Sequence, residues 1–310
     1  MLSTAARERL ERLGAVVFER GWLSSNNILI TGSRGPSALI DSGYSSHAAQ
    51  TLELVRTGLA GRPLDRLLNT HLHSDHCGGN ALLQREFSTL CTTIPPGLAD
   101  AVRRWDEDAL TYALTGQQCP RFHFGELLQP GESILLGDWS WEIHGAKGHD
   151  PHAIVLFQPD HGVLVSADAL WRNGFGVVFP ELEGESAFEE VAHTLDLIES
   201  LNPCVIVPGH GAVFEELDQA LAQARSRLER FSEFPAQHLR HAHKVLVKFK
   251  LLESRAMAFD QLLYWVQRTP YLTRAISVAG KDAQEWLEQI LSELERSHAV
   301  RREGPNVINT

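Results

Sequence analysis

Cysteine is scarce in this chain of 310 residues. The four cysteines are scattered, and no two form a Cys-x-x-Cys pair, so they do not resemble a disulfide framework. No apolar run reaches the roughly 20 residues that cross a membrane, and the charged N-terminal stretch MLSTAARERLERLG lacks the apolar core of a signal peptide. We therefore expect a soluble, cytoplasmic protein with no membrane partner. The cysteines are Cys77, Cys91, Cys119 and Cys204.

Basic charge is also in short supply, with 28 Lys and Arg against 39 Asp and Glu and a formal net charge of -11. A chain this acidic is not expected to bind nucleic acid over its whole surface, although a local basic patch could do so. Its length suits one large domain and a small one. Histidine, by contrast, is abundant: there are 15, several of them clustered among Gly and Asp. Histidine is the commonest metal ligand, so a metal site is the first hypothesis.

Strand and helix patterns follow one another over residues 1–232. The order is three strands, a helix, a strand and a helix, then four strands, a helix, a strand and a helix. This doubling predicts two packed sheets with helices on the outside, and loops at one edge of such a sandwich can converge on a site. The expected strands include AVVF, NNILIT, SALIDSG, SILLG, WSWEIHGA, HAIVLFQP, GVLVSAD and CVIVPGHG.

The pattern changes near Phe234 and Pro235, beyond which the strands disappear. Three segments with helical periodicity follow, over residues 238–253, 258–268 and 281–296. The tail HAVRREGPNVI is typical of a β-hairpin with Gly-Pro at its turn. We expect a mainly helical C-terminal domain over residues 233–310; a winged-helix-like domain and a plain helical cap are equally compatible with it.

The strongest motif is THLHSDHCGGN, which places His71, His73, Asp75 and His76 within six positions. Side chains in a strand repeat every two residues, so a strand end would put His71 and His73 on the same side. The following loop would turn Asp75 and His76 towards a second point, and the Gly-Gly pair allows a tight turn into the next helix. One short segment could therefore supply ligands to two adjacent metal ions.

Three more candidate ligands each follow an apolar strand: His149 in GHDPH, Asp168 in VSADAL and His210 in VPGHG. Each signal is weak alone, because an Asp after a strand is more often a turn or cap residue. Together with the first motif they complete two coordination shells.

In this order, HLHSDH, GHD, SAD and PGHG resemble the metallo-β-lactamase superfamily over residues 15 to about 230. The resemblance implies an α/β (α+β) fold, the αββα sandwich. It also implies that Asp168 bridges two metal ions and that Asp41, in LIDSG, supports the site from behind the ligands. One metal would be bound by His71, His73 and His149, and the other by Asp75, His76 and His210.

Imidazole and carboxylate ligands suit zinc, and also iron or manganese. Two ions about 3.5–4 Å apart would share a water and lower its pKa towards roughly 7. The resulting bridging hydroxide would attack an ester, thioester or lactone carbonyl. Asp75 could orient this hydroxide or move a proton to the leaving group, so Asp75 and Asp168 are the candidate catalytic residues. No Ser or Cys nucleophile is needed.

The chain departs from the family pattern at some points. Zinc β-lactamases generally lack the bridging aspartate, so Asp168 favours the glyoxalase II, lactonase and nuclease branches. His152 lies three residues after His149 where the family often has four, which leaves a substrate contact or a structural role open for it. Cys77 directly follows His76 and is expected to point away from the metals.

Two segments bear on the substrate. Trp171, Phe175 and Phe179 follow Asp168 and could form an apolar wall of a pocket, although core packing explains Phe179 equally well. HLRHAH, residues 238–243, has ligand-like spacing but lies in a basic helical stretch, so we expect a solvated helix face there.

The basic stretch itself could meet an anionic substrate or a phosphate backbone, or could be solvated. It contains Arg240, Lys244, Lys248 and Lys250. Two functions remain open: a dinuclear hydrolase of a small-molecule ester, thioester or lactone, and a metal-dependent endoribonuclease or phosphodiesterase, since the same metal core serves all these chemistries. The sequence gives no indication of the oligomeric state.

Overall fold

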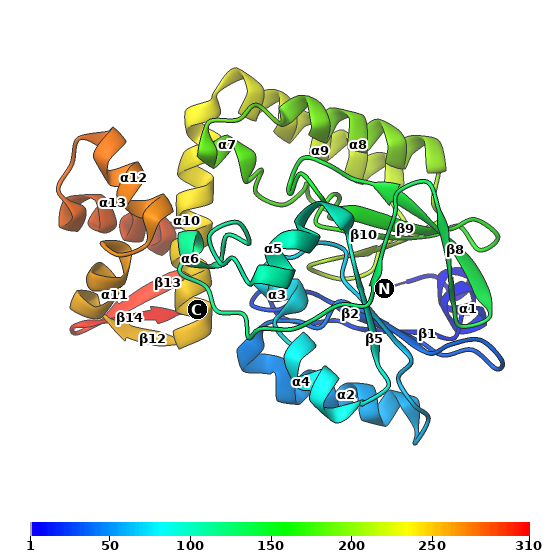
Figure 1. Cartoon of the computed structure of the whole chain (residues 1–310). Helices are drawn as coiled ribbons and strands as arrows, with labels where there is room; N and C mark the ends of the chain where they lie inside the picture. Colours follow the sequence, from blue (N-terminus) through cyan, green and yellow to red (C-terminus); the bar gives the residue numbers. More distant parts are fainter. Residues whose placement is uncertain (1) are drawn as a thin grey trace.

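Two β-sheets face each other at the centre of the molecule, which is a computed structural model that describes residues 2–310 (Figure 1). The strands of the first sheet lie side by side in the order in which they occur in the chain, and those of the second in the order β11-β10-β9-β8-β7. The first sheet contains β1 (Ala15–Phe18), β2 (Asn27–Ile30), β3 (Ala38–Ile40), β4 (Arg66–Leu68), β5 (Cys91–Ile94) and β6 (Glu126–Leu127). The second contains β7 (Ser133–Leu136), β8 (Trp139–Gly145), β9 (Ile154–Gln158), β10 (Val163–Ala167) and β11 (Val205–Pro208).

Central strands bury both of their faces, which explains why they are apolar throughout. In β2, Ile28 and Ile30 point into the core between the sheets, whereas Leu29 points to the outer side of the first sheet. In β10, Val163 and Val165 belong to the core between the sheets. The sandwich therefore has one core between its sheets and a further core beneath each helical layer.

Helices cover the outer face of each sheet (Figure 1). α2 (Ala48–Leu59) and α4 (Asn80–Glu86) pack on the first sheet through leucines and Val55. α8 (Phe188–Leu201) and α9 (Leu217–Glu233) pack on the second. The expected αββα sandwich is confirmed. α1 (Thr4–Arg12) precedes it, and the short helices α3 (Ser74–Cys77), α5 (Ala99–Arg104), α6 (Tyr112–Thr115) and α7 (Pro180–Glu183) lie in its connections.

Beyond α9 the chain forms four helices and a three-stranded sheet around a further hydrophobic cluster. The C-terminal hairpin is confirmed, but the expectation that strands disappear was wrong. A short third strand pairs with the hairpin, and a fourth helix begins at Pro270, a residue that is well tolerated in a first helical turn. The elements are α10 (Pro235–Ser254), β12 (Ala256–Ala258), α11 (Phe259–Val266), α12 (Pro270–Ala279), α13 (Ala283–Arg296), β13 (Val300–Glu303) and β14 (Asn306–Asn309).

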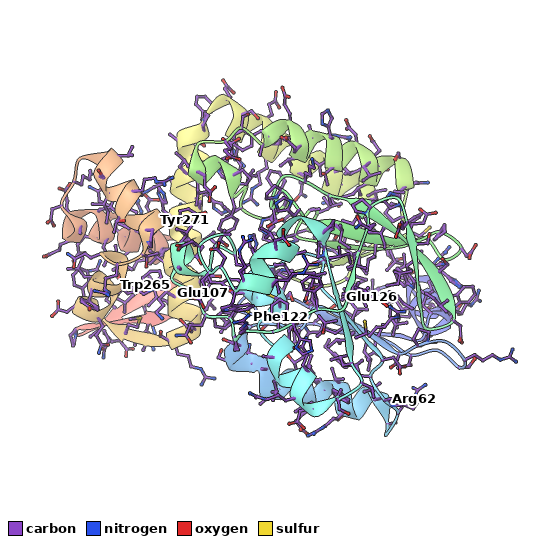
Figure 2. All side chains as sticks on the ribbon, in the orientation of Figure 1. Arg62, Glu107, Phe122, Glu126, Trp265 and Tyr271 are labelled. Carbon is purple, nitrogen blue, oxygen red and sulfur yellow. The ribbon has the colours of Figure 1, made fainter. Side chains whose placement is uncertain are left out.

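The C-terminal part packs against the sandwich through side chains from both. The cluster around α10–α13 also includes Val177 and Leu182 from the segment after β10. Tyr271, at the junction in Figure 2, donates a hydrogen bond to Glu183. The two domains over residues 1–232 and 233–310 therefore remain a proposal, supported by the start of α10 at Pro235 and by the hydrophobic cluster that α10–α13 form. Within residues 2–310, no helix combines the length and the apolar character required to cross a membrane.

Candidate metal centre

The candidate ligands gather where several strands end. Asp168 directly follows β10, and His210 lies two residues beyond β11. His71 and His73 do not lie on a strand end as expected, because β4 stops at Leu68 and an extended loop follows it. The one-turn helix α3 then carries Asp75 and His76. The loop and α3 together thus bring all four side chains of the first motif to one edge of the sandwich.

Three imidazoles converge on one point. His71 Nε2 lies 3.0 Å from His73 Nδ1, His73 Nδ1 lies 2.8 Å from His149 Nε2, and His149 Nε2 lies 3.2 Å from His71 Nε2. A neutral imidazole nitrogen carries either a proton or a lone pair, so at least one of these three contacts joins two like nitrogens. A cation shared by three lone pairs would resolve this conflict.

A second group lies next to the first. His210 Nε2 is 3.1 Å from Asp75 Oδ2, and His76 Nε2 is 4.0 Å from the same oxygen. Asp168 lies between the groups: its Oδ2 is 3.4 Å from His149 Nε2, and its Oδ1 is 3.5 Å from His76 Nε2. Each carboxylate oxygen of Asp168 therefore faces a different group of ligand atoms, as a bridging ligand would.

Six of the seven predicted ligands are buried, and Asp75 is partly buried. Burial and the neighbouring histidines lower the pKa of His71 well below its usual value, and burial lowers that of His73 to about 4. Burial raises the pKa of the Asp168 carboxyl, but the nearby His210 and His76 outweigh this and hold it well below its usual range. Neutral His71 and His73 beside the ionised Asp168 form a good donor set for a cation. Burial lowers the pKa of His76, but Asp41, Asp168 and Asp75 outweigh this and raise it well above its usual value, so a metal bound there would displace a proton.

The geometry of the donor set fits a metal ion. A tetrahedral zinc about 2.0–2.1 Å from each nitrogen would separate its ligands by about 3.3 Å, close to the spacing of the three imidazole nitrogens. His76 Nε2 is buried without a hydrogen-bond partner among the described residues. The candidate ligands form three sets, and within each set the ligand atoms lie within 4.8 Å of one another. The sets are His71, His73 and His149; His71, His76 and Asp168; and Asp75, His76 and His210.

Other residues orient the ligands through their outer nitrogens. Asp41 Oδ2 lies 2.7 Å from His76 Nδ1, and its two oxygens also accept hydrogen bonds from the backbone N–H and the hydroxyl of Thr70. Asp41 thus occupies the supporting position that the sequence resemblance implies. Such hydrogen bonds fix the tautomer and ring direction of a ligating histidine.

His149 is oriented by the segment after β10, which is held in turn by α10 of the C-terminal part. Its Nδ1 lies 2.6 Å from the backbone oxygen of Val177, and the next N–H, of Val178, donates to His238 Nε2 at 3.0 Å. His238 is buried, so the expectation that HLRHAH forms a solvated face was wrong for this residue. Helical periodicity could have found it, because His238 shares a face of α10 with the buried Ala242.

Two glycines leave the space that the site occupies. A Cβ added at Gly209 would come 2.1 Å from Asp168 Oδ1, and one added at Gly176 would come 2.3 Å from His149 Nδ1. Real side chains cannot approach so closely, so both positions require glycine. Gly209 was visible in the PGHG motif, whereas nothing near Gly176 in the sequence marked it.

Two of the doubtful candidates lie outside the ligand groups. The Cys77 thiol points away, as expected: its sulfur lies 3.1 Å from the Tyr112 hydroxyl and 3.7 Å from Cys119 Sγ. His152 belongs to none of the ligand groups, and its ring packs against Gly97.

A cavity of about 370 Å³ opens over the ligands. Trp171 and Phe179 line it as expected, but Phe175 is buried in the core beneath α8 and α9. Trp22 also lines it and stacks on His210, with ring centroids 5.4 Å apart. Sequence reasoning missed Trp22, an isolated aromatic residue in a loop. The site is therefore a metal-ligand cluster beneath an aromatic-rimmed pocket.

The basic side chains of α10 mostly contact partners within the C-terminal part. Arg240 and Lys244 pair with Glu293 of α13 at 2.8 and 3.1 Å, and Lys250 pairs with Glu253 at 2.6 Å. Lys248 donates to the backbone oxygen of Thr310. Most of this positive charge thus serves contacts within the C-terminal part.

The chain belongs to the metallo-beta-lactamase superfamily, whose family model matches residues 20–210. It is 26% identical over 144 residues to the mitochondrial persulfide dioxygenase ETHE1 of Bos taurus and, equally, to a hydroxyacylglutathione hydrolase of Bdellovibrio bacteriovorus; each match covers 46% of this chain and 47% of the relative. It is 24% identical over 216 residues to an atrochrysone carboxyl ACP thioesterase of Aspergillus fumigatus, covering 67% of this chain and 58% of that protein. The chain thus spans about half the length of the first two relatives.

Solved structures share the fold. A metallo-beta-lactamase family protein of Thermus thermophilus aligns with a TM-score of 0.54 at 19% identity, over 96% of this chain and 99% of that chain. A protein solved in a di-iron-bound form aligns with a TM-score of 0.51 at 24% identity, over 67% of this chain and 98% of that one. The first alignment extends through the C-terminal helices as well as the sandwich.

Proposed function

We propose that this protein is a metal-dependent hydrolase that attacks an ester, thioester or lactone carbonyl. The observation that carries the proposal is Asp168, whose two oxygens face two adjacent groups of candidate ligands. We assign one metal to His71, His73 and His149, the second to Asp75, His76 and His210, and both to Asp168. Two zinc ions are proposed, and iron or manganese would suit the same donors.

Bound metal ions would supply a water of lowered pKa and polarise the carbonyl oxygen. The chain's own groups would handle protons and solvent. Asp75 Oδ2 lies 3.1 Å from His210 Nε2, and the Asp75 carboxylate lines the cavity, where it could pass a proton to the leaving group. Trp22 and Trp171, whose ring centroids are 5.4 Å apart, lie beside His210 at this cavity and would limit entry of bulk water.

Thioesters are the first substrate class to test. Two relatives carry names of thioester or glutathione-ester hydrolases, and the cavity combines an apolar rim with a few polar groups, as small-molecule sites do. The relative named as a dioxygenase shows that the superfamily scaffold also serves other reactions. The alternative, a phosphodiesterase or endoribonuclease, is less favoured because ion pairs occupy most of the basic stretch on α10.

A hydrolysis panel would test the proposal. Metal-loaded protein, chelator-treated protein and the variant Asp168→Ala are compared on thioesters, esters, lactones, a phosphodiester and RNA. We expect turnover of at least one carbonyl substrate, its loss on chelation and its recovery on adding zinc. Turnover of RNA or the phosphodiester alone would favour the alternative function, and activity that survives chelation would refute the metal-dependent mechanism.

A further inference from the structure

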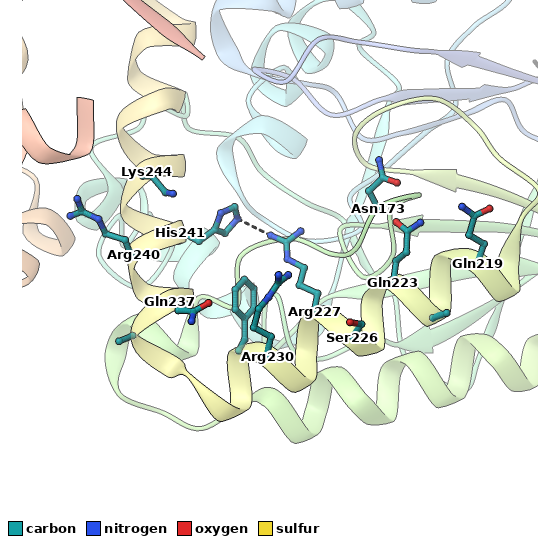
Figure 3. Close-up of a pocket in the computed structure, with 13 residues that line it drawn as sticks. Asn173, Gln219, Gln223, Ser226, Arg227, Arg230, Gln237, Arg240, His241 and Lys244 are labelled. Atoms are coloured by element: carbon teal, nitrogen blue, oxygen red, sulfur yellow. Dashed lines mark hydrogen bonds between the residues drawn. The ribbon is translucent and has the colours of Figure 1, made fainter. Parts of the chain in front are cut away.

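A large groove of about 1060 Å³ lies between α9 and α10, beside the metal cavity (Figure 3). Asn173, Arg227 and His241 line both the groove and the cavity above the ligands. The two spaces therefore adjoin at these three side chains. A substrate whose scissile bond lies at the metals could extend past Arg227 into the groove.

Arg227 is a cation without an acidic partner. Within residues 2–310, no carboxylate oxygen lies within 4.0 Å of the guanidinium of Arg227 or Arg230. Arg225, two residues before Arg227 on the same helix, is paired instead with Asp196 at 2.8 Å and Glu199 at 2.7 Å. The two unpaired arginines of α9 are those that line the groove.

The side chain of Arg227 is held in place by neutral contacts. Its Nη2 donates to His241 Nε2 at 2.8 Å, and its guanidinium carbon lies 5.4 Å from the ring centroid of Phe175 and 5.2 Å from that of Phe231. Burial, followed by the charge of Arg227, lowers the pKa of His241 to about 3, so this imidazole is neutral and adds no opposite charge. The guanidinium is thus fixed on two aromatic rings while its charge remains uncompensated.

A glycine allows the guanidinium to lie against the loop that follows Asp168. Gly174 has a φ of +128°, and a Cβ added there would come 2.8 Å from Arg227 Nη1. The arginine is therefore fixed against the segment that links Asp168 to the cavity wall. A partly buried charge without a counterion is unfavourable, and an anion bound beside it would remove that cost.

We propose that Arg227, assisted by Arg230, binds an anionic group on the carrier portion of an acyl substrate while the scissile carbonyl lies in the metal cavity. Carboxylate and phosphate share the chemistry that a guanidinium recognises through paired hydrogen bonds. This inference rests on the proposed hydrolase function and specifies its substrate class as acyl esters or thioesters with a negatively charged carrier.

The experiment uses one acyl group on three carriers: neutral N-acetylcysteamine, glutathione with its carboxylates, and coenzyme A with its phosphates. For wild-type protein we expect kcat/KM about tenfold or more higher with at least one anionic carrier than with the neutral one. Which anionic carrier is preferred distinguishes the carboxylate from the phosphate. Equal kcat/KM for all three carriers would overturn the anion subsite while leaving the hydrolase proposal intact.

Variants of single arginines test which side chain gives the preference for the anionic carrier. In Arg227→Gln, the preference for the anionic carrier should fall about tenfold, chiefly through KM, whereas hydrolysis of the neutral thioester should persist. Arg230→Gln, at an exposed position, should give a smaller loss and covers the case in which Arg227→Gln folds poorly. Arg225→Gln is the matched control on the same helix and should leave the preference unchanged. An equal loss on all three carriers in Arg227→Gln and none in Arg230→Gln would mean that Arg227 is structural.

Binding is measured separately from turnover. The S-methyl derivatives of the same three carriers cannot be hydrolysed, and their binding can be followed by quenching of the tryptophans that line the cavity. Tighter binding of an anionic derivative to wild type than to Arg227→Gln would support the subsite even if no thioester is hydrolysed, an outcome that would refute only the hydrolase function. No difference between carriers or variants would refute the subsite itself.

Discussion

HLHSDH at residues 71–76 and HLRHAH at residues 238–243 look alike as sequences, yet the structure uses them differently. The first lies in an extended loop and a one-turn helix, and two of its imidazoles meet a third within 3.2 Å. The second lies inside the 20-residue helix α10. There His238 contacts Val178, His241 contacts Arg227 and His243 packs on Trp286.

The difference shows that closely spaced histidines can form a metal site only where the backbone directs their side chains to one point. Position i+5 of a helix points away from positions i and i+3, whereas a loop can curl its side chains around one point. The histidines of α10 are partners of backbone and arginine groups, and those of the loop are partners of each other. Four predictions would break or sharpen this comparison.

The largest effect is expected from Asp168→Ala, because Asp168 serves both groups of ligands. Both metals should be lost, and hydrolysis should fall by more than about 100-fold. Elemental analysis of protein purified without chelator measures the metal content. His152→Ala is the control and should keep its metal. A loss in His152→Ala as complete as that in Asp168→Ala would show that the ligand assignment is incorrect.

A smaller effect is expected from His71→Gln, which removes one nitrogen from the group of three imidazoles. The metal content should fall from about two ions to about one per chain, since the second group keeps its own ligands. The matched change in the helix, His243→Gln, should leave the content unchanged. The comparison fails if both variants lose the same amount of metal, as measured by the same elemental analysis.

His238→Leu should have a more modest effect, because His238 acts on the ligand His149 only indirectly, through the peptide that joins Val177 and Val178. Without its ring nitrogen, the N–H of Val178 loses its acceptor, and the neighbouring carbonyl that orients His149 becomes less fixed. We expect metal affinity to weaken by about tenfold at the site of His149. Zinc titration with a competing chelator measures this. Unchanged affinity, together with a lowered melting temperature, would show that His238 only stabilises the fold.

The smallest effect concerns pH. Burial, and to a lesser extent nearby cations, lower the pKa values of His238 and His243 to about 4 and that of His241 to about 3. In the unfolded chain these groups take up protons near pH 6.5, before the folded state does. The free energy of unfolding should therefore fall as pH drops from about 6.5 to about 4, by up to roughly 1.4 kcal/mol per pH unit for each histidine.

The metal ligands also titrate in acid, so a variant is needed to isolate the contribution of His243 to the pH dependence. Between pH 7.5 and pH 5, the melting temperature of His243→Gln should fall less than that of the wild type, because the variant has one fewer group to protonate on unfolding. Parallel falls in both proteins would show that His243 has an ordinary pKa in the folded state.

Sequence reasoning succeeded where the signal was local. Strands such as AVVF and SILLG have the expected bounds to within a residue or two, and the hairpin around Gly304 and Pro305 was predicted from its turn. It failed where the outcome depended on distant packing. Nothing local distinguishes Phe175, buried under α9, from Phe179, which lines the cavity.

The sequence by itself determined the αββα sandwich and the set of candidate ligands, because apolar periodicity and closely spaced His and Asp residues are local properties of the chain. Only the tertiary structure decided which nitrogens meet, that the carboxylate of Asp168 faces two groups, and that Arg227 is left without a counterion. These are distances between residues up to 135 positions apart, as between Asp75 and His210. They depend on how strand ends, loops and α10 pack together, and no short segment of sequence contains that information.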